Sequence, residues 1–188
     1  MRVVLASKSP RRRELLSKLF SEFEIIVSDA DESLPRGISP ASCAETVAAR
    51  KGAAVAEEVG GDALVISSDT MVELDGIILG KPASESDAHR MLSMLSGRRH
   101  NVHTGVAVYY KGKVFSGAAT TAVEFRTLTD GEIDEYIASG EPMDKAGAYG
   151  IQGLGGAFVT GYDGDFDTVV GLSLALTERL VKEATSND

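Results

Sequence analysis

A continuous apolar run, Ala-Leu-Val-Ile-Ser at residues 63–67, is the strongest fold signal in this 188-residue chain. A run that does not alternate with charged residues is typical of a β-strand buried on both faces. Such a strand needs cover on each side of its sheet, so we expect flanking helices. With 43% apolar residues, the chain can build a core of that kind.

Strand and helix patterns alternate along the chain. Strands are expected at residues 3–5, 24–28, 63–67, 71–74, 77–79, 102–110, 114–125 and about 157–159. Helices are expected over residues 10–16, 40–59, 85–96 and 130–139, with a terminal helix from about Ser173. Turn residues at 75–76 and 111–113 predict two hairpins. This order predicts one α/β domain over residues 1–188, with a mixed twisted sheet, flanking helices and an ordered glycine-dense loop at 147–156.

Charge and cysteine content narrow the class of protein. The net charge of −9 argues against a broad nucleic-acid surface, so an anionic ligand needs a local positive site, helped by a divalent cation. The single cysteine, Cys43, cannot form an internal disulfide, and no apolar run is long enough for a membrane span or a signal peptide. We therefore expect a soluble, cytoplasmic protein with no nucleic-acid or membrane partner.

Positive charge is nevertheless concentrated near the N-terminus. The basic residues that precede the first acidic residue are Arg2, Lys8, Arg11, Arg12 and Arg13. Ser9 as an N-cap and Pro10 as the first helical residue place this run at the start of a helix, directly after a short buried strand. Free helix N–H groups and guanidinium forks bind phosphate oxygens, which favours a phosphate site. The alternative is a solvated basic turn.

Carboxylates at two places are candidate metal ligands. Asp69 follows the buried apolar run, where we expect the strand to end and the chain to turn, and ligands of open α/β sheets bind at strand ends. Asp31 and Glu32 lie in an acidic loop. Brought into one cleft opposite Arg11 and Arg12, these carboxylates would form a hard oxygen site suited to Mg²⁺ or Mn²⁺. The alternatives are a turn-capping aspartate and solvated loop charges.

Lys81 and Gln152 are further candidates. Lys81 follows Gly80, but the spacing is one residue short of a P-loop and Pro82 replaces the required hydroxyl residue. Lys81 is therefore either an isolated charge that reaches a phosphate or a surface lysine. The Gln152 amide offers an acceptor and a donor that match the carbonyl and ring N–H edge of a pyrimidine. Alternatively, Gln152 satisfies the backbone of its own packed loop.

The histidines do not support a zinc site or a nucleophilic triad. His100 and His103 lie three residues apart in an expected strand and so point to opposite faces, and His89 stands apart on a helix. The chain has no Gly-x-Ser-x-Gly motif of an esterase. We interpret all three histidines as structural or surface residues.

Five spaced blocks of the sequence resemble the Maf family of nucleoside triphosphate pyrophosphatases. The blocks are residues 5–16 (LASKSPRRRELL), 68–70 (SDT), 79–82 (LGKP), 95–97 (LSG) with 104–106 (TGV), and 144–153 (DKAGAYGIQG). They span nearly the whole chain, and five blocks in order are far more specific than one motif. The resemblance implies a Maf/ITPase-like fold with two lobes around a nucleotide-binding cleft.

The resemblance also implies an activity. Members of the family hydrolyse a nucleoside triphosphate between its α and β phosphates with a divalent metal, Mg²⁺ or Mn²⁺, and release a nucleoside monophosphate and pyrophosphate. Residues 69–70 and 144–147 look like the branch that acts on dTTP and UTP rather than on 7-methyl-GTP. The implied role is house-cleaning of nucleotide pools, modified pyrimidine nucleotides included. A homodimer is an expectation from the family alone.

The resemblance assigns roles to individual residues. Asp69 corresponds to the proton acceptor that activates water, and we expect it to bind the metal together with Glu32. The positions that match substrate choice are Arg11, Thr70 and Gln152. The residues expected to hold the triphosphate are Ser7, Arg11, Arg12, Lys51 and Lys81. The residues expected elsewhere in the cleft are Asp144 and Lys145.

Departures from the family pattern are few, and rival functions stay open. Ser68 stands where alanine is frequent and Ser173 where many members have proline, and we expect neither to touch the chemistry. A phosphatase would release orthophosphate, and a regulatory protein of septum formation would bind a nucleotide without turnover. RNA binding through residues 11–13 is the weakest alternative, because no aromatic stacking residues lie nearby.

Overall fold

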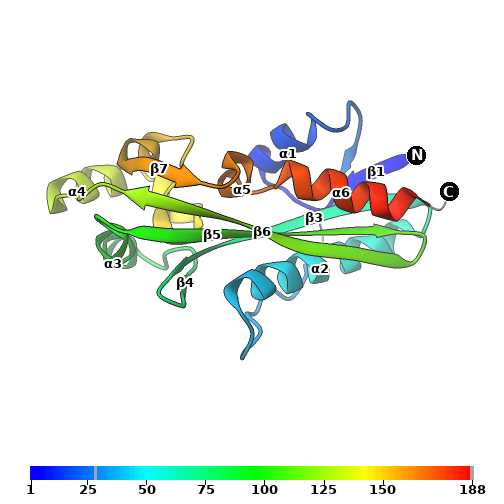
Figure 1. Cartoon of the computed structure of the whole chain (residues 1–188), viewed down its shortest axis with the longest axis horizontal. Coiled ribbons are helices and arrows are strands. Elements are labelled where there is room, and N and C mark those ends of the chain that lie inside the picture. The colour runs from blue at the N-terminus through cyan, green and yellow to red at the C-terminus, as the bar shows by residue number, and fades with distance from the viewer. Residues whose placement is uncertain (28, 187–188) are drawn as a thin grey trace. The chain divides into compact units, whose positions relative to one another are not determined.

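The computed structural model describes residues 1–27 and 29–186. Within these residues, seven strands form one sheet in the order β2-β1-β3-β5-β6-β7, with β4 paired to β3 (Figure 1). The strands are β1 (Arg2–Leu5), β2 (Glu24–Ile25), β3 (Ala63–Leu74), β4 (Ile77–Leu79), β5 (Arg99–Tyr110), β6 (Lys113–Phe125) and β7 (Val159–Asp163). The α-helices are α1 (Pro10–Leu16), α2 (Pro40–Val59), α3 (Glu85–Leu95), α4 (Asp130–Ala138), α5 (Phe166–Val170) and α6 (Leu174–Thr185). Short 3₁₀ helices are η1 (Glu141–Asp144), η2 (Ala146–Ala148) and η3 (Leu154–Phe158).

The sheet is mixed and flanked by helices, which confirms the predicted fold class. β1 pairs in parallel with both β2 and β3, whereas β4 is antiparallel to β3 and β7 is antiparallel to β6. The caps of several helices follow the sequence signals, and the Thr129–Glu132 capping box at the start of α4 is complete. Across the described residues, no helix is both long and apolar enough to cross a membrane.

The chain packs as two compact units. The first comprises Met1–Thr70, Thr104–Ala119 and the chain from Gly171 onward, and the second comprises Met71–His103 and Thr120–Val170. Strands β3, β5 and β6 each contribute residues to both units. That residues 1–188 act as a single domain, with a nucleotide-binding cleft between two lobes, stays a prediction.

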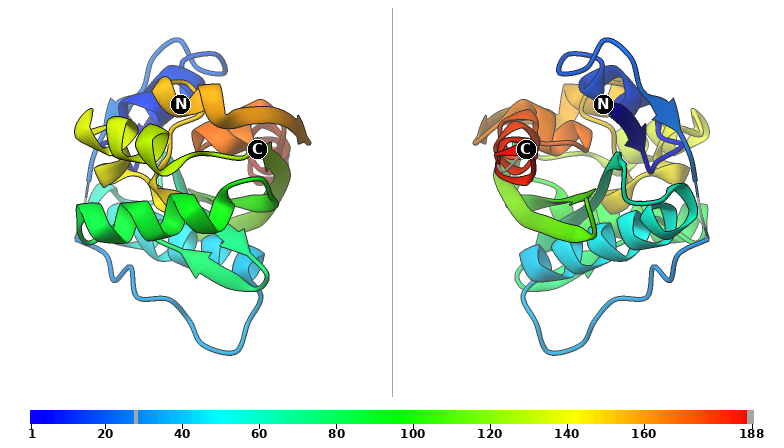
Figure 2. Two further views of the ribbon diagram at one scale, coloured as in Figure 1. Left: turned by 90° about the vertical axis from the view of Figure 1, so that its left-hand side faces the viewer. Right: turned by 90° about the vertical axis from the view of Figure 1, so that its right-hand side faces the viewer.

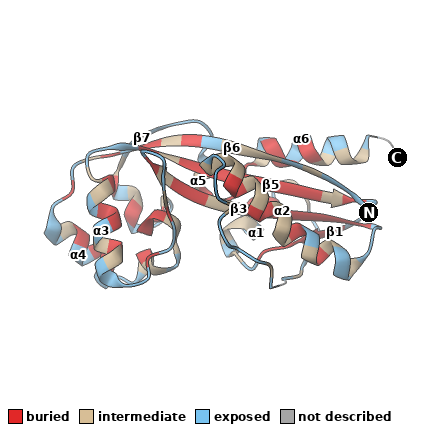
Figure 3. Ribbon diagram, turned by 90° about the horizontal axis from the view of Figure 1, so that it is seen from below, coloured by how far each residue is buried: buried red, intermediate tan, exposed pale blue. Residues whose placement is uncertain are grey.

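In the first unit, helices cover both faces of the sheet. α2 lies on one face, and α1 and α6 lie on the other (Figures 1 and 2). Residues 63–68 of β3 are all buried, which confirms the strand that the apolar run predicts. Figure 3 shows long buried stretches along the strands, whereas α6 alternates between buried and exposed residues. This alternation is expected of an amphipathic helix on a core.

Two glycines let α2 lie close to the strands. At Gly52 of α2, a Cβ atom would lie 2.8 Å from the ring of Tyr109. At Gly105 of β5, a Cβ atom would overlap the backbone of Ala44 and Glu45. Because such distances are far below van der Waals contact, α2 keeps its place only with glycine at these positions. The helix is thereby held close to β5.

The second unit has its own core, formed by its parts of the strands with α3, α4 and the 3₁₀ helices. Aromatic rings dominate it: Phe125 packs edge-to-face on Tyr149 at 4.7 Å between centroids, and Tyr136 packs edge-to-face on Phe158 at 5.0 Å. Aliphatic residues of α3, such as Leu92, complete this core. The aromatic pairs fix the position of the chain around Tyr149, which belongs to the glycine-dense loop.

Three expectations about strands are wrong. The strand at 63–67 does not end before Asp69, because β3 continues to Leu74 and its polar stretch keeps contact with β5. The strand near 157–159 begins at Val159, since residues 154–158 form η3. The strand at 24–28 is reduced to Glu24–Ile25, and Ser28 lies outside the described residues.

Candidate active site

The middle of β3 lies beside the end of β1 in the first unit. β1 stops at Leu5, opposite Ile66, and the chain then passes through Ser7 into α1. β3 therefore extends past the carboxyl end of its parallel neighbour, which is where open α/β sheets bind ligands. The strand end that was expected after residues 63–67 is thus the end of β1, while β3 runs on past it.

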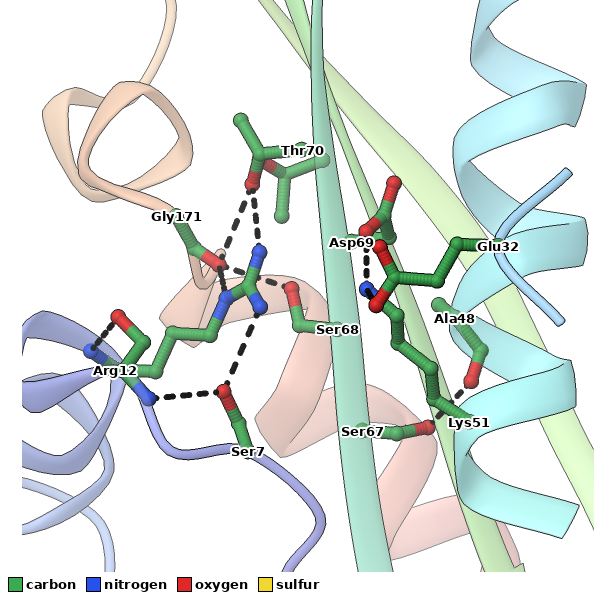
Figure 4. A network of polar contacts seen from close by, with 12 residues as sticks. Ser7, Arg12, Glu32, Ala48, Lys51, Ser67, Ser68, Asp69, Thr70 and Gly171 are labelled. Atoms are coloured by element: carbon green, nitrogen blue, oxygen red, sulfur yellow. Dashed lines mark hydrogen bonds and ion pairs between the residues drawn. The ribbon is translucent and has the colours of Figure 1, made fainter. Parts of the chain in front are cut away.

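Successive side chains of β3 point to opposite faces of the sheet. Figure 4 shows Asp69 turned toward α2, with Ser68 and Thr70 turned to the other side. Two polar networks result, one around Asp69 and one around the hydroxyl of Thr70. Arg12 belongs to the second network and has no hydrogen bond to Asp69, although the charge of Asp69 still acts on it.

The first network joins Asp69, Lys51 and Glu32. Lys51, on α2, donates from Nζ to Asp69 Oδ1 at 2.6 Å, and its Nζ lies 3.0 Å from Glu32 Oε1. The side chains of Lys51 and Asp69 are 16% and 15% exposed, whereas that of Glu32 is 64% exposed. The Lys51 ammonium therefore contacts both the Asp69 and the Glu32 carboxylates. Lys51 was expected to bind phosphate.

The carboxylates of Asp69 and Glu32 are oxygen donors of the kind that hard divalent cations prefer. Among the described residues there is no cluster of three or more His, Cys, Asp or Glu side chains that could hold a metal. Mg²⁺, however, is usually bound by one or two carboxylates, with substrate phosphates and water as its other ligands. Asp31, the other candidate, pairs instead with Ser33 and Arg50.

The second network fixes Arg12, in the first turn of α1. Its Nε donates to the carbonyl of Gly171 at 2.8 Å, Nη2 to Thr70 Oγ1 at 3.2 Å and Nη1 to Ser7 Oγ at 3.4 Å. Burial lowers the pKa of the Arg12 guanidinium, and the charge of Asp69 opposes this shift. An arginine stays protonated even so. Arg12 is thus a cation held in one orientation, and Thr70 is one of its hydrogen-bond partners.

The carbonyl of Gly171 is the part of this network that the sequence did not reveal. It accepts hydrogen bonds from Arg12 Nε and from Ser68 Oγ, each at 2.8 Å. Gly171 has φ = 129°, which favours glycine. The sequence signal that could have pointed to this position is the glycine itself, two residues before Ser173, the N-cap of α6. Ser68 was expected not to touch the chemistry, but its hydroxyl donates to the same Gly171 carbonyl as Arg12 Nε does.

The start of α1 is as predicted. Ser9 is the N-cap and accepts from the Arg12 backbone N–H at 3.4 Å, and Pro10 is the first helical residue. Arg11 is half-buried and Lys8 is exposed. The basic run thus divides into the half-buried Arg11 and Arg12, of which Arg12 is held by side-chain hydrogen bonds, and the exposed Lys8 and Arg13.

Four predicted site residues belong to the second unit. Lys81 and Gln152 are exposed, and Lys145 Nζ donates to Asp144 Oδ1 at 2.7 Å. The Gly147 N–H donates to the Gly80 carbonyl at 3.1 Å, which ties the segment of Lys81 to the loop that leads to Gln152. The alternative in which Gln152 satisfies its own loop is not what the described residues show, since its side chain makes no hydrogen bond among them.

The histidines take structural positions. His100 Nε2 lies 2.8 Å from Tyr149 Oη, and His103 Nδ1 lies 2.8 Å from Thr120 Oγ1. Both are buried and both lie in the second unit. Neither belongs to the networks around Asp69 and Arg12.

Three relatives of this chain carry the name dTTP/UTP pyrophosphatase. The dTTP/UTP pyrophosphatase of Moorella thermoacetica is 51% identical over 182 residues, which cover 96% of this chain and 93% of the relative. That of Thermococcus gammatolerans is 48% identical over 178 residues, covering 95% and 94%. That of Bacillus cereus (strain B4264) is 46% identical over 187 residues, covering 100% and 96%.

Solved structures are more distant. The Staphylococcus aureus Ham1 protein has a TM-score of 0.49 and 18% identity, over 66% of this chain and 72% of that chain. This likeness is too remote to add to the sequence comparison. A family model described as Maf-like protein, by contrast, matches residues 2–184. With the identities of 46–51%, this match shows that the chain belongs to the Maf family.

Proposed function

We propose that this protein hydrolyses dTTP and UTP to the nucleoside monophosphate and pyrophosphate. The names of its relatives, at 46–51% identity over nearly their whole lengths, support the substrate class. The observation that carries the chemistry is the withdrawn Asp69 carboxylate held by Lys51 on one face of β3, together with Arg12, fixed in the first turn of α1 on the other face. A positioned base and a positioned cation are what phosphoryl transfer requires.

Phosphate binding is assigned to the residues after β1. Ser7 and Arg12 are already fixed there, and Arg11 adds a second guanidinium from the same turn of α1. A guanidinium that is held before substrate arrives loses little freedom on binding, so it stabilises developing charge efficiently. We propose that Lys81 also contacts phosphate and that Gln152 reads the base, with Asp144 and Lys145 nearby; these roles rest on the family resemblance.

Asp69 is the proposed base. Its carboxylate accepts a proton from a water molecule, and the water oxygen forms a bond to the α-phosphorus. The bond from that phosphorus to the bridging oxygen breaks, and pyrophosphate leaves with the bonding electrons. Lys51 holds Asp69 in place. A divalent cation held by Asp69 and Glu32 would supply charge neutralisation at the phosphates.

A product assay tests the proposal. Purified protein with Mg²⁺ is given dTTP, UTP, CTP, GTP, ATP or 7-methyl-GTP, and pyrophosphate and orthophosphate are measured separately. We expect pyrophosphate from dTTP and UTP, and a loss of about 10²–10⁴-fold in kcat for Asp69→Asn, the usual contribution of a general base. Asp62→Asn, an exposed position just before β3, is the matched control.

Two results would overturn the proposal. Orthophosphate without pyrophosphate would indicate a phosphatase, and nucleotide binding without any product would indicate a regulatory binding protein. A cytoplasmic location, a homodimer and the absence of nucleic-acid partners stay predictions that these assays do not address.

A further inference from the structure

The carboxylate of Glu141 is enclosed by the glycine-dense loop of the second unit. Its Oε1 accepts from Tyr136 Oη at 2.8 Å and from the Gly155 N–H at 3.2 Å, and its Oε2 accepts from the Leu154 N–H at 2.9 Å. Tyr136 Oη in turn accepts from the Gly150 N–H at 3.1 Å. One side chain and its tyrosine partner therefore hold the loop at three backbone positions.

The glycines of the loop are fitted to this carboxylate. A Cβ atom at Gly153 would lie 2.5 Å from Glu141 Oε1, and one at Gly155 would lie 2.7 Å from Tyr136 Oη. Real side chains essentially never come so close, so the backbone reaches Glu141 only because these positions lack a Cβ. The loop was expected to use its glycines to approach a ligand, yet here they approach a side chain of the protein itself.

Glu141 is ionised at neutral pH. Burial opposes ionisation, but the hydrogen bonds from Leu154, Tyr136 and Gly155 and the charge of Lys145 hold the pKa of Glu141 below its ordinary value. Two adjacent backbone N–H groups facing one anion form a nest, which binds negative charge well. Because Glu141 occupies the nest, the N–H groups of Leu154 and Gly155 are not available to a substrate phosphate.

Gln152 lies between the two fixed parts of the loop. Gly150, two residues before it, is bonded to Tyr136, and Leu154, two residues after it, is bonded to Glu141. The Gln152 side chain itself is exposed and makes no hydrogen bond to another described residue. An unbonded amide on a backbone fixed from both sides is well suited to recognise the edge of a base.

We infer that Glu141 is a positioning residue for substrate choice: its carboxylate fixes the loop that carries Gln152, and so determines how strongly dTTP and UTP are preferred over CTP. This inference rests on the proposed function, in which Gln152 reads the base. CTP is the informative competitor because cytosine presents an amine where thymine and uracil present a carbonyl, and it lacks their ring N–H. If the loop is displaced, the protein no longer distinguishes these bases, although it still binds the phosphates.

The variant Glu141→Gln tests the inference. It keeps the size of the side chain but places an NH₂ group or a weaker acceptor against the Leu154 N–H. We expect KM for dTTP and UTP to rise and the ratio of kcat/KM for dTTP over CTP to fall about tenfold, the fold-change typical of one disrupted hydrogen bond to a charged group. Inhibition by inorganic tripolyphosphate, which has no base, is expected to stay unchanged within about twofold.

Controls separate positioning from damage. Glu135→Gln, at an exposed position of α4, is expected to leave the dTTP over CTP ratio unchanged. Tyr136→Phe keeps the bonds from the Leu154 and Gly155 N–H groups to Glu141, but it removes the tyrosine hydroxyl that donates to Glu141 and accepts from the Gly150 N–H. It is therefore expected to lower the ratio less than Glu141→Gln does. This second variant tests the inference if the first does not fold.

Two outcomes would overturn the inference. One is a wild-type ratio in a folded Glu141→Gln protein, and the other is a uniform loss for every nucleotide together with weaker tripolyphosphate inhibition. Failure of the wild-type protein to release pyrophosphate from dTTP or UTP would instead refute the proposed function, and is seen before any variant is made.

Discussion

Lys51 Nζ lies 2.6 Å from Asp69 Oδ1, and both side chains are largely withdrawn from solvent. The pair joins α2 to β3, and the same ammonium lies 3.0 Å from Glu32 Oε1. Coulomb interactions at such distances are stronger in a partly desolvated site than at the protein surface. The Lys51 ammonium therefore offsets part of the negative charge of Asp69 and Glu32.

Replacing Lys51 by methionine removes a positive charge from between two carboxylates. We expect Mn²⁺ to bind the nucleotide-free protein about tenfold more tightly, because its coulombic competitor is gone, while dTTP turnover falls because Asp69 is no longer held. Mn²⁺ binding is measured by electron paramagnetic resonance and turnover by pyrophosphate release. Lys51→Arg keeps the charge and serves as the control. Equal Mn²⁺ affinity in Lys51→Met and wild type would argue against Asp69 and Glu32 as the metal ligands.

Arg12 is expected not to tolerate lysine. A lysine ammonium cannot reach Gly171, Thr70 and Ser7 in the forked geometry that Arg12 uses. We expect kcat/KM for dTTP to fall about 10- to 100-fold, because one bidentate phosphate contact and its orientation are lost. The comparison is Arg13→Lys, at an exposed position of the same helix. Steady-state kinetics of the two variants decides. An Arg12→Lys protein with the wild-type kcat/KM would show that charge alone matters at this position.

Local signals in the sequence predicted much of the fold. Ser9-Pro10 and the Thr129–Glu132 capping box mark helix starts that the structure confirms, because these caps depend on residues only a few positions apart. The strand through Asp69 is longer than predicted, because the polar residues that follow residues 63–67 do not end it. The pairing that carries β3 through this stretch, such as Thr70 with Thr104, is not visible along the chain.

The sequence proposes candidate site residues one by one, but it does not predict how the structure arranges them. Asp69 and Arg12 were both proposed as functional residues, and the structure puts them in separate networks on two faces of β3. The Gly171 carbonyl bonds to an arginine 159 positions away, and a backbone carbonyl has no residue-specific signature. Such long-range contacts depend on the packing of α6 and α1, which no local pattern encodes.

Gly105→Ala is expected to destabilise the protein and impair the site together. A Cβ atom at this position would overlap the backbone of Ala44, so α2 must move away from β5. Overpacking of this kind costs about 1–3 kcal/mol, and the movement would separate Lys51 from Asp69. Urea unfolding and dTTP turnover are measured on the same samples. Gly61→Ala, where a Cβ would have ample room, is the control; a normal turnover in Gly105→Ala would show that α2 need not be held so closely.

His100 is expected to make the protein less stable in acid. It is 2% exposed, and burial lowers its pKa from 6.5 to about 4, against the opposing effects of a backbone hydrogen bond at Arg98 and the charge of Glu73. Above pH 6.5 the imidazole is neutral in both states and contributes no pH dependence. As the pH falls from 6.5 to about 4, the unfolded chain takes up a proton that the folded protein does not, so the free energy of unfolding decreases. The loss over this window is about 3 kcal/mol, at about 1.4 kcal/mol for each pH unit.

His100→Gln isolates this contribution, because glutamine can keep the hydrogen bond to Tyr149 but does not titrate. We expect its free energy of unfolding to fall less between pH 6.5 and 4 than that of the wild type, by up to the amount assigned to His100. His89→Gln, at a half-buried position on α3, is the comparison for the loss of an imidazole at another place in the second unit. Urea unfolding at a series of pH values measures both. Parallel curves for His100→Gln and wild type would mean that the acid sensitivity comes from other groups, such as the ion pairs of the first unit.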